Sequence, residues 1–260
     1  MSKPSYIIFS LLLLLTSCSS IDDSDRLIYV KPADAQRCVL IEDFTGQRCV
    51  NCPNATQVIE DLQQQYGPDT VIAVSIHSGP LGFHGNSKNI GLATDLGDTY
   101  YNYWQCEYQP VGMINRGTLS NFTEWSQQVR TSLAAISSLS LKANIFSAAG
   151  DSIQASIHAE GIKGYTQGKL QVWLIEDSIT ALQMMPDGKA NYQYQHNHVL
   201  RASMNGEWGD DFALNESETK DLSFSIAAES AWQLSNLRIV AFVYNAEGVI
   251  QVTRSPRLKL

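Results

Sequence analysis

The sequence predicts an α/β domain followed by an all-β domain. Strand and helix signals alternate over residues 38–138, which is typical of a sheet covered by helices. From Leu139 onward, apolar residues recur at every second position in short segments separated by turns, which is typical of antiparallel strands. A chain of 260 residues has the length of about two domains. We therefore expect domains at residues 38–138 and 139–260, preceded by an export signal and a tether.

The export signal is expected at residues 1–17. Lys3 precedes an apolar run of ten residues, Tyr6–Leu15, which is too short for a spanning helix and has the length of a signal-peptide core. The small residues Thr16 and Ser17 then lead to Cys18, a pattern that resembles a bacterial lipobox. An ordinary signal peptide with an incidental cysteine is the alternative. We expect Cys18 to carry lipid that holds the protein on a membrane.

Residues 18–37 are expected to form the acylated tether. Ser19–Asp25 is small, polar and acidic, a composition that does not support a packed core. An acidic patch at this place resembles an export signal to the outer cell surface in some bacteria, and a solvated tether without a routing role is the alternative. The membrane face on which the protein lies stays open.

The charge balance excludes several classes of function. The formal net charge is −8, from 18 basic and 26 acidic residues, and no Lys/Arg run stands out. Tight binding to a nucleic-acid backbone needs clustered positive charge, so we expect no nucleic-acid partner. No second long apolar run follows the N-terminus, which excludes a multi-spanning membrane protein.

The predicted α/β domain contains three strands and three helices. Each helix has apolar residues on one face, and the second strand is a continuous apolar run of the kind that is covered on both faces. In chain order we expect a strand at Val39–Phe44, a helix at Pro53–Tyr66, a strand at Val71–Ile76, a helix at Leu92–Trp104, a strand at Val111–Arg116 and a helix at Asn121–Ile136.

The predicted all-β domain contains about seven strands in about 120 residues, which is typical of an immunoglobulin-like β-sandwich. The strands are expected at Leu139–Ile145, Ile153–Ala159, Leu170–Ile175, Tyr192–Ala202, Leu222–Ile226, Leu237–Tyr244 and Val249–Thr253.

Cys49 and Cys52 form the motif that carries chemistry. They are three positions apart, after a predicted strand and at the start of a predicted helix. A helix N-terminus carries partial positive charge and unpaired N–H groups, which favour a thiolate at the first cysteine, and Arg48 adds charge beside it. Cys49 would then attack and Cys52 would resolve the mixed disulfide.

This stretch resembles the signature of the thioredoxin superfamily. Asp43 and Phe44 precede Cys49 by six and five residues, as a buried aspartate and phenylalanine do in that superfamily, and Pro110 resembles its substrate-docking cis-proline. The resemblance implies a thioredoxin-like domain with Cys49, Cys52, Asp43 and Pro110 as catalytic residues. Thr45 and Arg48 replace tryptophans of the superfamily, and the 61-residue separation of Cys49 and Pro110 implies an insertion.

The mature chain also resembles the twenty-eight-kilodalton outer-membrane protein family of bacterial lipoproteins. The resemblance is carried by Glu42–Gly46 before the cysteine motif, Gln109–Arg116, His198–Arg201 and Gly206–Gly209. It implies a lipid-anchored protein of the bacterial outer membrane with a thioredoxin-like domain and a β-sandwich.

Alternatives remain for the candidate residues. Cys49 and Cys52 have three interpretations: a redox dithiol, a structural disulfide or a zinc site. The zinc interpretation is the weakest, because a single cysteine pair lacks the second pair that a zinc site usually has. Asp43 is a proton relay for Cys52 or a satisfied core carboxylate. For Cys38 and Cys106, two buried thiols are favoured over a mutual disulfide, because the intervening strand is too long.

Other side chains have weaker functional interpretations. His77 and His84 line a substrate groove or are polar loop residues. His196 and His198 lie on one face of a predicted strand, where a metal site would lack a third ligand. The aromatic cluster at residues 100–104 belongs to the core or to a pocket. We expect neither a metal nor another cofactor.

Two functions follow from these patterns. The first is thiol–disulfide exchange with protein thiols and disulfides by a membrane-anchored oxidoreductase. The second is a non-catalytic surface lipoprotein that binds a protein or another ligand through its sandwich and loop insertion, with the cysteine pair as a static disulfide.

Overall fold

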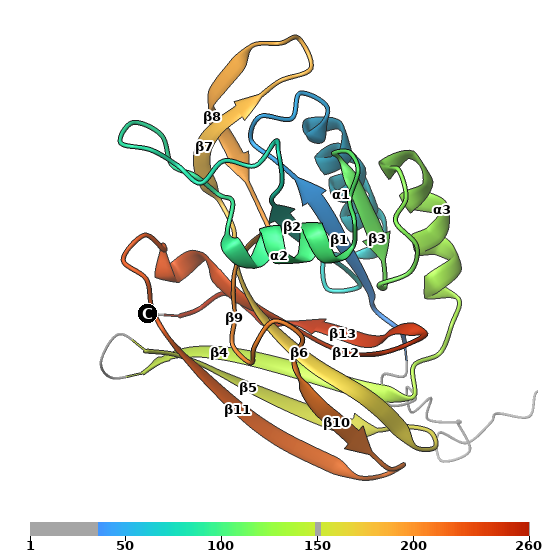
Figure 1. Ribbon diagram of the computed structural model, residues 1–260. Coiled ribbons are helices and arrows are strands. Elements are labelled where there is room, and N and C mark those ends of the chain that lie inside the picture. The colour runs from blue at the N-terminus through green and yellow to red at the C-terminus, as the bar shows by residue number, and fades with distance from the viewer. Residues whose placement is uncertain (1–35, 149–151, 260) are drawn as a thin grey trace, which may run out of the picture. The chain divides into compact units, whose positions relative to one another are not determined.

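The computed structural model describes residues 36–148 and 152–259 (Figure 1). The predicted signal peptide, Cys18 and almost all of the predicted tether lie outside the described residues. These described residues all belong to one compact unit. Within its described part, no helix is both long enough and apolar enough to cross a membrane.

The first half alternates strands and helices as the sequence predicts. Its elements are β1 (Val39–Thr45), α1 (Cys52–Tyr66), β2 (Val71–His77), α2 (Asp95–Tyr103), β3 (Val111–Ile114) and α3 (Phe122–Leu133). Strand β1 lies between β2, which is parallel to it, and β3, which is antiparallel. Parallel pairing of β1 and β2 requires the crossover that α1 supplies.

The second half is made of strands. They are β4 (Leu139–Ala148), β5 (Ser152–Gly161), β6 (Thr166–Glu176), β7 (Ile179–Met184), β8 (Ala190–His196), β9 (Val199–Ser203), β10 (Asp210–Leu214), β11 (Thr219–Ala227), β12 (Leu237–Asn245) and β13 (Gly248–Arg254). The coarse fold class, α/β elements followed by β-strands, is therefore confirmed.

One predicted strand is wrong. Residues 192–202 form two strands, because His198 has a positive φ of 59° and turns the chain between β8 and β9. Its backbone N–H donates to Asp177 Oδ1 over 3.0 Å, which holds this turn. Strands β7 and β10 were not predicted; both are short, and β7 has only two buried side chains.

The predicted end of the third helix is also wrong. Helix α3 ends at Leu133, and Ile136 is 78% exposed rather than part of the buried face. Trp125 and Val129 are buried as predicted. Leu133 packs partly buried against the same core, so three of the four periodic apolar positions lie in the helix and only Ile136 lies beyond it.

One sheet contains strands from both halves of the chain. Its order is β13-β12-β6-β9-β2-β1-β3, and β10 also pairs with β6. The link between halves is the β2–β9 pair, where Ser75 lies opposite Val199 and Ser75 N–H donates to the His198 carbonyl oxygen over 2.8 Å. Two smaller sheets are formed by β11-β5-β4 and by the β7–β8 hairpin.

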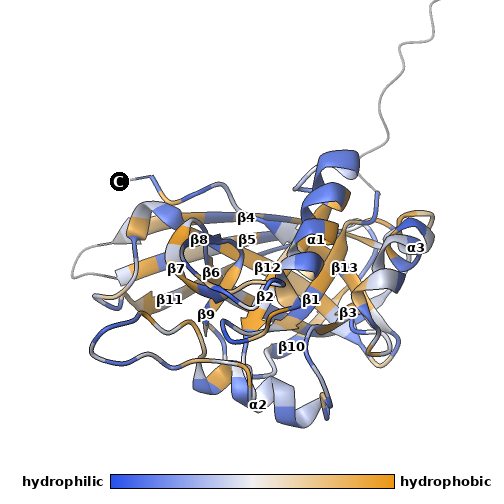
Figure 2. Ribbon diagram, turned by 90° about the horizontal axis from the view of Figure 1, so that it is seen from above, coloured by the Kyte–Doolittle hydropathy of each residue, from blue (hydrophilic) through white to orange (hydrophobic). Residues whose placement is uncertain are grey.

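Alternate residues of β1 belong to two different cores. Val39 and Ile41 pack with α1 and α3, whereas Leu40 and Phe44 pack in a core that includes α2 and the aromatic residues of β6 and β12. A third core lies between the β11-β5-β4 sheet and β6 and β12. Figure 2 shows the result: β1 and β13 are largely apolar, and α2 is mainly polar. The α1-facing side of β1 is the side that positions the candidate site.

Candidate functional site

A disulfide joins Cys49 and Cys52 at the carboxyl end of β1, with their Cα atoms 5.4 Å apart. Helix α1 begins at Cys52, and Pro53 is tolerated in its first turn because the N–H groups there have no helical partner. Cys52 is thus the first helical residue, one position before the predicted start of the helix at Pro53, and Cys49 lies in the turn before the helix. The positive end of the helix is consequently nearest to Cys52.

The turn that carries Cys49 is fixed by close backbone contacts. Cys49 N–H donates to the Gly46 carbonyl oxygen over 3.0 Å, and Arg48 N–H donates to the Leu81 carbonyl oxygen over 3.0 Å. A Cβ atom at Gly46 would lie 2.2 Å from that Leu81 oxygen, so only glycine allows this approach. Arg48 itself lies over the ring of Phe83, 5.0 Å from its centroid.

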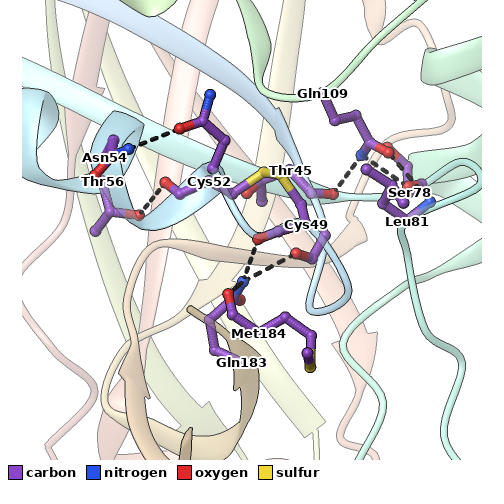
Figure 3. Close-up of a disulfide and its surroundings, with 12 residues drawn as sticks. Thr45, Cys49, Cys52, Asn54, Thr56, Ser78, Leu81, Gln109, Gln183 and Met184 are labelled. Atoms are coloured by element: carbon purple, nitrogen blue, oxygen red, sulfur yellow. Dashed lines mark hydrogen bonds between the residues drawn. A yellow bond between two sulfur atoms is a disulfide. The ribbon is translucent and has the colours of Figure 1, made fainter. Parts of the chain in front are cut away.

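The β7–β8 hairpin covers the turn. Gln183 Nε2 donates to the carbonyl oxygens of Cys49 and Gly46, over 2.8 and 3.3 Å (Figure 3). Met184 N–H donates to the Gln47 carbonyl oxygen over 2.8 Å, and Gln47 Nε2 donates to the Leu182 carbonyl oxygen over 3.0 Å. Cys49 and Cys52 are each only 2% exposed. Sequence reasoning missed this hairpin.

Asp43 is buried two residues before Thr45, on the same face of β1, toward α1. It is 1% exposed, and neither carboxylate oxygen has a hydrogen-bond partner among the described residues. Burial raises the pKa of Asp43 to about 8. The carboxyl group is therefore mainly protonated at neutral pH, and it is not the satisfied core carboxylate that was the alternative expectation.

Pro110 follows a residue that ties its segment to β1 and β2. Gln109 Nε2 donates to the carbonyl oxygens of Thr45 and Ser78 over 2.7 and 2.9 Å, and the Gln109–Pro110 peptide bond is cis. Val111 then lies opposite Phe44 in the sheet. The structure thus brings the cysteine pair, Asp43 and Pro110 to the same end of β1.

A cavity of 220 Å³ lies beside Cys52, between α1, β2 and the β7–β8 hairpin. Its lining includes Thr45, Ser75, His77, Tyr194 and His196. The rings of His77 and His196 meet edge to face with centroids 5.2 Å apart. His77 Nδ1 and His196 Nε2 are buried without hydrogen-bond partners among the described residues.

Both of these histidines are neutral at pH 7. Burial lowers the pKa of His196 to about 4. Burial, followed by the charges of His196 and Arg201, lowers the pKa of His77 well below its ordinary value. Two neutral imidazoles therefore supply hydrogen-bonding atoms to the cavity without adding charge.

The remaining histidines have other roles. The expected pairing of His196 and His198 on one strand face is wrong, because His198 lies in the turn after β8. His198 Nδ1 lies 3.2 Å from Asp177 Oδ1. His84 pairs with Asp98 of α2 over 2.8 Å. Within the described ranges, no group of three His, Cys, Asp or Glu side chains is arranged to hold a metal ion.

Cys106 and the aromatic cluster belong mainly to the core. Cys106 is a buried thiol rather than half of a Cys38–Cys106 disulfide, and burial raises its pKa to about 12. Tyr100 is buried, whereas Tyr103 is exposed and contacts Trp208 in a tilted arrangement with ring centroids 4.2 Å apart. The cluster thus joins α2 to the loop before β10.

A family model provides the decisive comparison. The model of the outer membrane protein Omp28 matches residues 97–256, which is more than half of the sequence. The chain belongs to the Omp28 outer membrane protein family. The family expected from the sequence and its location in the bacterial outer membrane are both confirmed.

Solved structures that are similar to this Omp28-family chain include two proteins of Porphyromonas gingivalis. HBP35 of Porphyromonas gingivalis has 14% sequence identity and a TM-score of 0.65, over 86% of this chain and 76% of its own. At this sequence identity, the similarity to HBP35 shows a common fold and nothing about function. A domain of the outer membrane lipoprotein Omp28 from Porphyromonas gingivalis has 25% identity and a TM-score of 0.35, over 48% of this chain and 93% of its own. Among curated proteins, none matches this sequence.

Proposed function

We propose that this Omp28-family chain is a lipid-anchored thiol–disulfide oxidoreductase whose reacting groups are Cys49 and Cys52. The observation that carries the proposal is the disulfide at the start of α1 with the buried, unpartnered carboxyl group of Asp43 on the α1-facing side of β1. A carboxyl group whose pKa is near 8 exchanges protons at physiological pH, which a purely structural core does not require.

In the proposed reaction, the reduced Cys49 thiolate attacks a disulfide of a protein substrate. The Cys49–substrate mixed disulfide forms, and one substrate sulfur leaves as a thiolate. Cys52 then attacks the Cys49 sulfur, which closes the Cys49–Cys52 disulfide and releases the second substrate thiol. Asp43 accepts the Cys52 proton when it is ionised, and Pro110 docks the extended substrate.

The proposal includes a fold assignment. Strands β2, β1 and β3, with α1 and α3 on one face and α2 on the other, support a thioredoxin-like domain at residues 38–138. The β11-β5-β4 sheet packed on β6 and β12 supports an immunoglobulin-like sandwich at residues 139–260. The predicted anchor is lipid on Cys18, and its test is loss of membrane association in a Cys18→Ala variant.

The second candidate function is a non-catalytic surface lipoprotein with a structural disulfide. Its specific support is the 2% exposure of both cysteines beneath the β7–β8 hairpin. A disulfide that is closed on all sides by protein would resist exchange. This alternative predicts a fixed bond and a binding role for the sandwich.

Redox titration of the full chain in detergent separates the two functions. A Cys49–Cys52 potential between about −120 and −270 mV, together with reduction of insulin that is lost in Cys49→Ser, supports exchange. A potential below about −300 mV without insulin turnover supports the structural disulfide. Cys106→Ser is the matched control, because that buried thiol lies outside the disulfide.

A further inference from the structure

We propose that the Cys49–Cys52 disulfide is reduced by a low-molecular-weight thiol that enters the cavity beside Cys52 and attacks the Cys52 sulfur. This inference rests on the proposed oxidoreductase function and identifies its electron donor. The first observation is that the two cysteines have different surroundings. The hairpin bonds to the Cys49 backbone through Gln183, whereas the cavity is lined by Cys52 and, within the described part of the chain, not by Cys49.

The size of the cavity selects the donor. A volume of 220 Å³ accommodates an amino-thiol such as free cysteine and excludes a folded protein. A protein thiol, like the protein substrate, would reach either sulfur only after the hairpin detaches, whereas a small thiol would enter the closed structure through the cavity. The electron donor that fits the closed structure is therefore a small molecule.

The lining of the cavity is suited to a polar, zwitterionic molecule. Glu60 of α1 and Arg257 supply charges of opposite sign, and Arg257 Nη2 lies 3.6 Å from Asp177 Oδ2, which also lines the cavity. His77 and His196 also line the cavity, and their buried ring nitrogens, His77 Nδ1 and His196 Nε2, have no hydrogen-bond partner among the described residues. Buried polar atoms usually have partners, so these two orphaned nitrogens indicate that a hydrogen-bonding molecule belongs here.

The reaction balances with two small thiols. The first thiolate attacks the Cys52 sulfur, forms a mixed disulfide and expels the Cys49 thiolate. A second thiolate attacks the small-molecule sulfur of that mixed disulfide, which releases the Cys52 thiolate and the oxidised small disulfide. Two electrons and two protons thus pass from two small thiols to Cys49 and Cys52.

The test measures the rate at which the disulfide of the full chain in detergent is lost, by alkylation and mass spectrometry. Free cysteine and a reduced thioredoxin are compared at equal thiol concentration. We expect free cysteine to react faster. Thr56→Trp places a large ring in the cavity wall and should slow reduction by cysteine about tenfold, because access limits the exchange rate.

Gln57→Trp is the matched control, because Gln57 is the exposed neighbour of Thr56 on α1 and is not part of the lining. It should leave the rate within about twofold of the parent. Glu60→Trp at the same cavity replaces Thr56→Trp if that variant does not fold.

The outcomes separate the two proposals. If thioredoxin reduces the disulfide at least as fast as cysteine does, or if neither cavity variant slows cysteine, the small-thiol route is wrong and the oxidoreductase function stands. If no thiol reduces the folded chain, the disulfide is structural, and both proposals fail.

Discussion

The side-chain amide of Gln183 donates a hydrogen bond to the carbonyl oxygen of Cys49 over 2.8 Å. The same nitrogen also lies 3.3 Å from the Gly46 carbonyl oxygen. These contacts join the β7–β8 hairpin to a turn that lies more than a hundred residues earlier in the chain. Burial of the cysteine pair therefore depends on the second half of the protein as well as on the motif itself.

The contact predicts the effect of Gln183→Ala. Loss of the amide removes the Gln183 donor from the buried Cys49 carbonyl oxygen, while the Gly46 oxygen keeps Cys49 N–H, so we expect the free energy of unfolding to fall by about 1–3 kcal/mol. The Met184 amide, which donates to Gln47, should also exchange its hydrogen faster. Urea titration and hydrogen exchange measure the two effects. Gln193→Ala, on the exposed side of the same hairpin, is the control, and an equal effect of both variants would contradict the role of Gln183.

Asp43 predicts an unusual dependence of stability on pH. Its pKa is about 8 in the folded protein and about 3.9 in the unfolded chain. Because the pKa of Asp43 is raised in the folded protein, the contribution of this group to the free energy of unfolding is fully present below about pH 4. That contribution is lost as pH rises through about 8. Between these values the folded state binds more protons, and the free energy of unfolding falls by up to about 1.4 kcal/mol per pH unit from this group alone.

Replacing Asp43 with asparagine isolates this contribution. The amide stays neutral, so Asp43→Asn should gain stability relative to the parent as pH rises from 5 to 8, with only a small further gain from 8 to 9, where the titration of Asp43 ends. Urea titrations at these pH values measure the difference. Asp61→Asn on exposed α1 is the control. A difference between parent and Asp43→Asn that does not change with pH would show that Asp43 does not titrate in this range.

The strands of the first half were predictable from local patterns. Val71–Ile76 is a continuous apolar run because both faces of β2 are covered, and its predicted bounds differ from the observed strand by one residue. The cysteine motif and Asp43 were equally visible, because each lies at a fixed distance from the end of β1. Local sequence therefore predicted the residues that meet at this edge of the sheet.

Features that depend on distant contacts were not predictable. Gln183 and Met184 belong to a short, half-exposed strand whose function is set by its contact with residues 46–49. His196 meets His77 only because β8 and β2 are brought together by β9. Neither contact leaves a periodic signal in the sequence, since each depends on tertiary packing.

Gly46 predicts a steric effect on the same turn. A Cβ atom would lie 2.2 Å from the Leu81 carbonyl oxygen, so Gly46→Ala must displace backbone. We expect a loss of about 1–3 kcal/mol in the free energy of unfolding, as for overpacking in a core. Gly117→Ala, where the nearest atom is 3.1 Å away at an exposed turn, is the matched control and should cost less. Urea titration of both variants checks the prediction, which an unchanged stability of Gly46→Ala would refute.

The last prediction concerns the buried ion pair of Glu42 and Arg116. Arg116 Nε lies 3.4 Å from Glu42 Oε1, and both side chains are almost fully buried. The guanidinium also lies over the ring of Tyr244, 4.0 Å from its centroid. Removal of one partner leaves a buried charge without its counter-ion, so Glu42→Gln should lower the free energy of unfolding by about 3–5 kcal/mol.

A double-mutant cycle tests this pair. Glu42→Gln and Arg116→Gln together remove both charges, so the double variant should lose less stability than the sum of the two single losses. The exposed Lys169–Asp211 pair, with atoms 3.1 Å apart, is the control, and Lys169→Gln should cost no more than about 1 kcal/mol because solvent screens it. Additive losses in the cycle would mean that Glu42 and Arg116 act independently. In that case the contact of Arg116 with the ring of Tyr244, rather than its pairing with Glu42, would account for the burial of the guanidinium beneath β12.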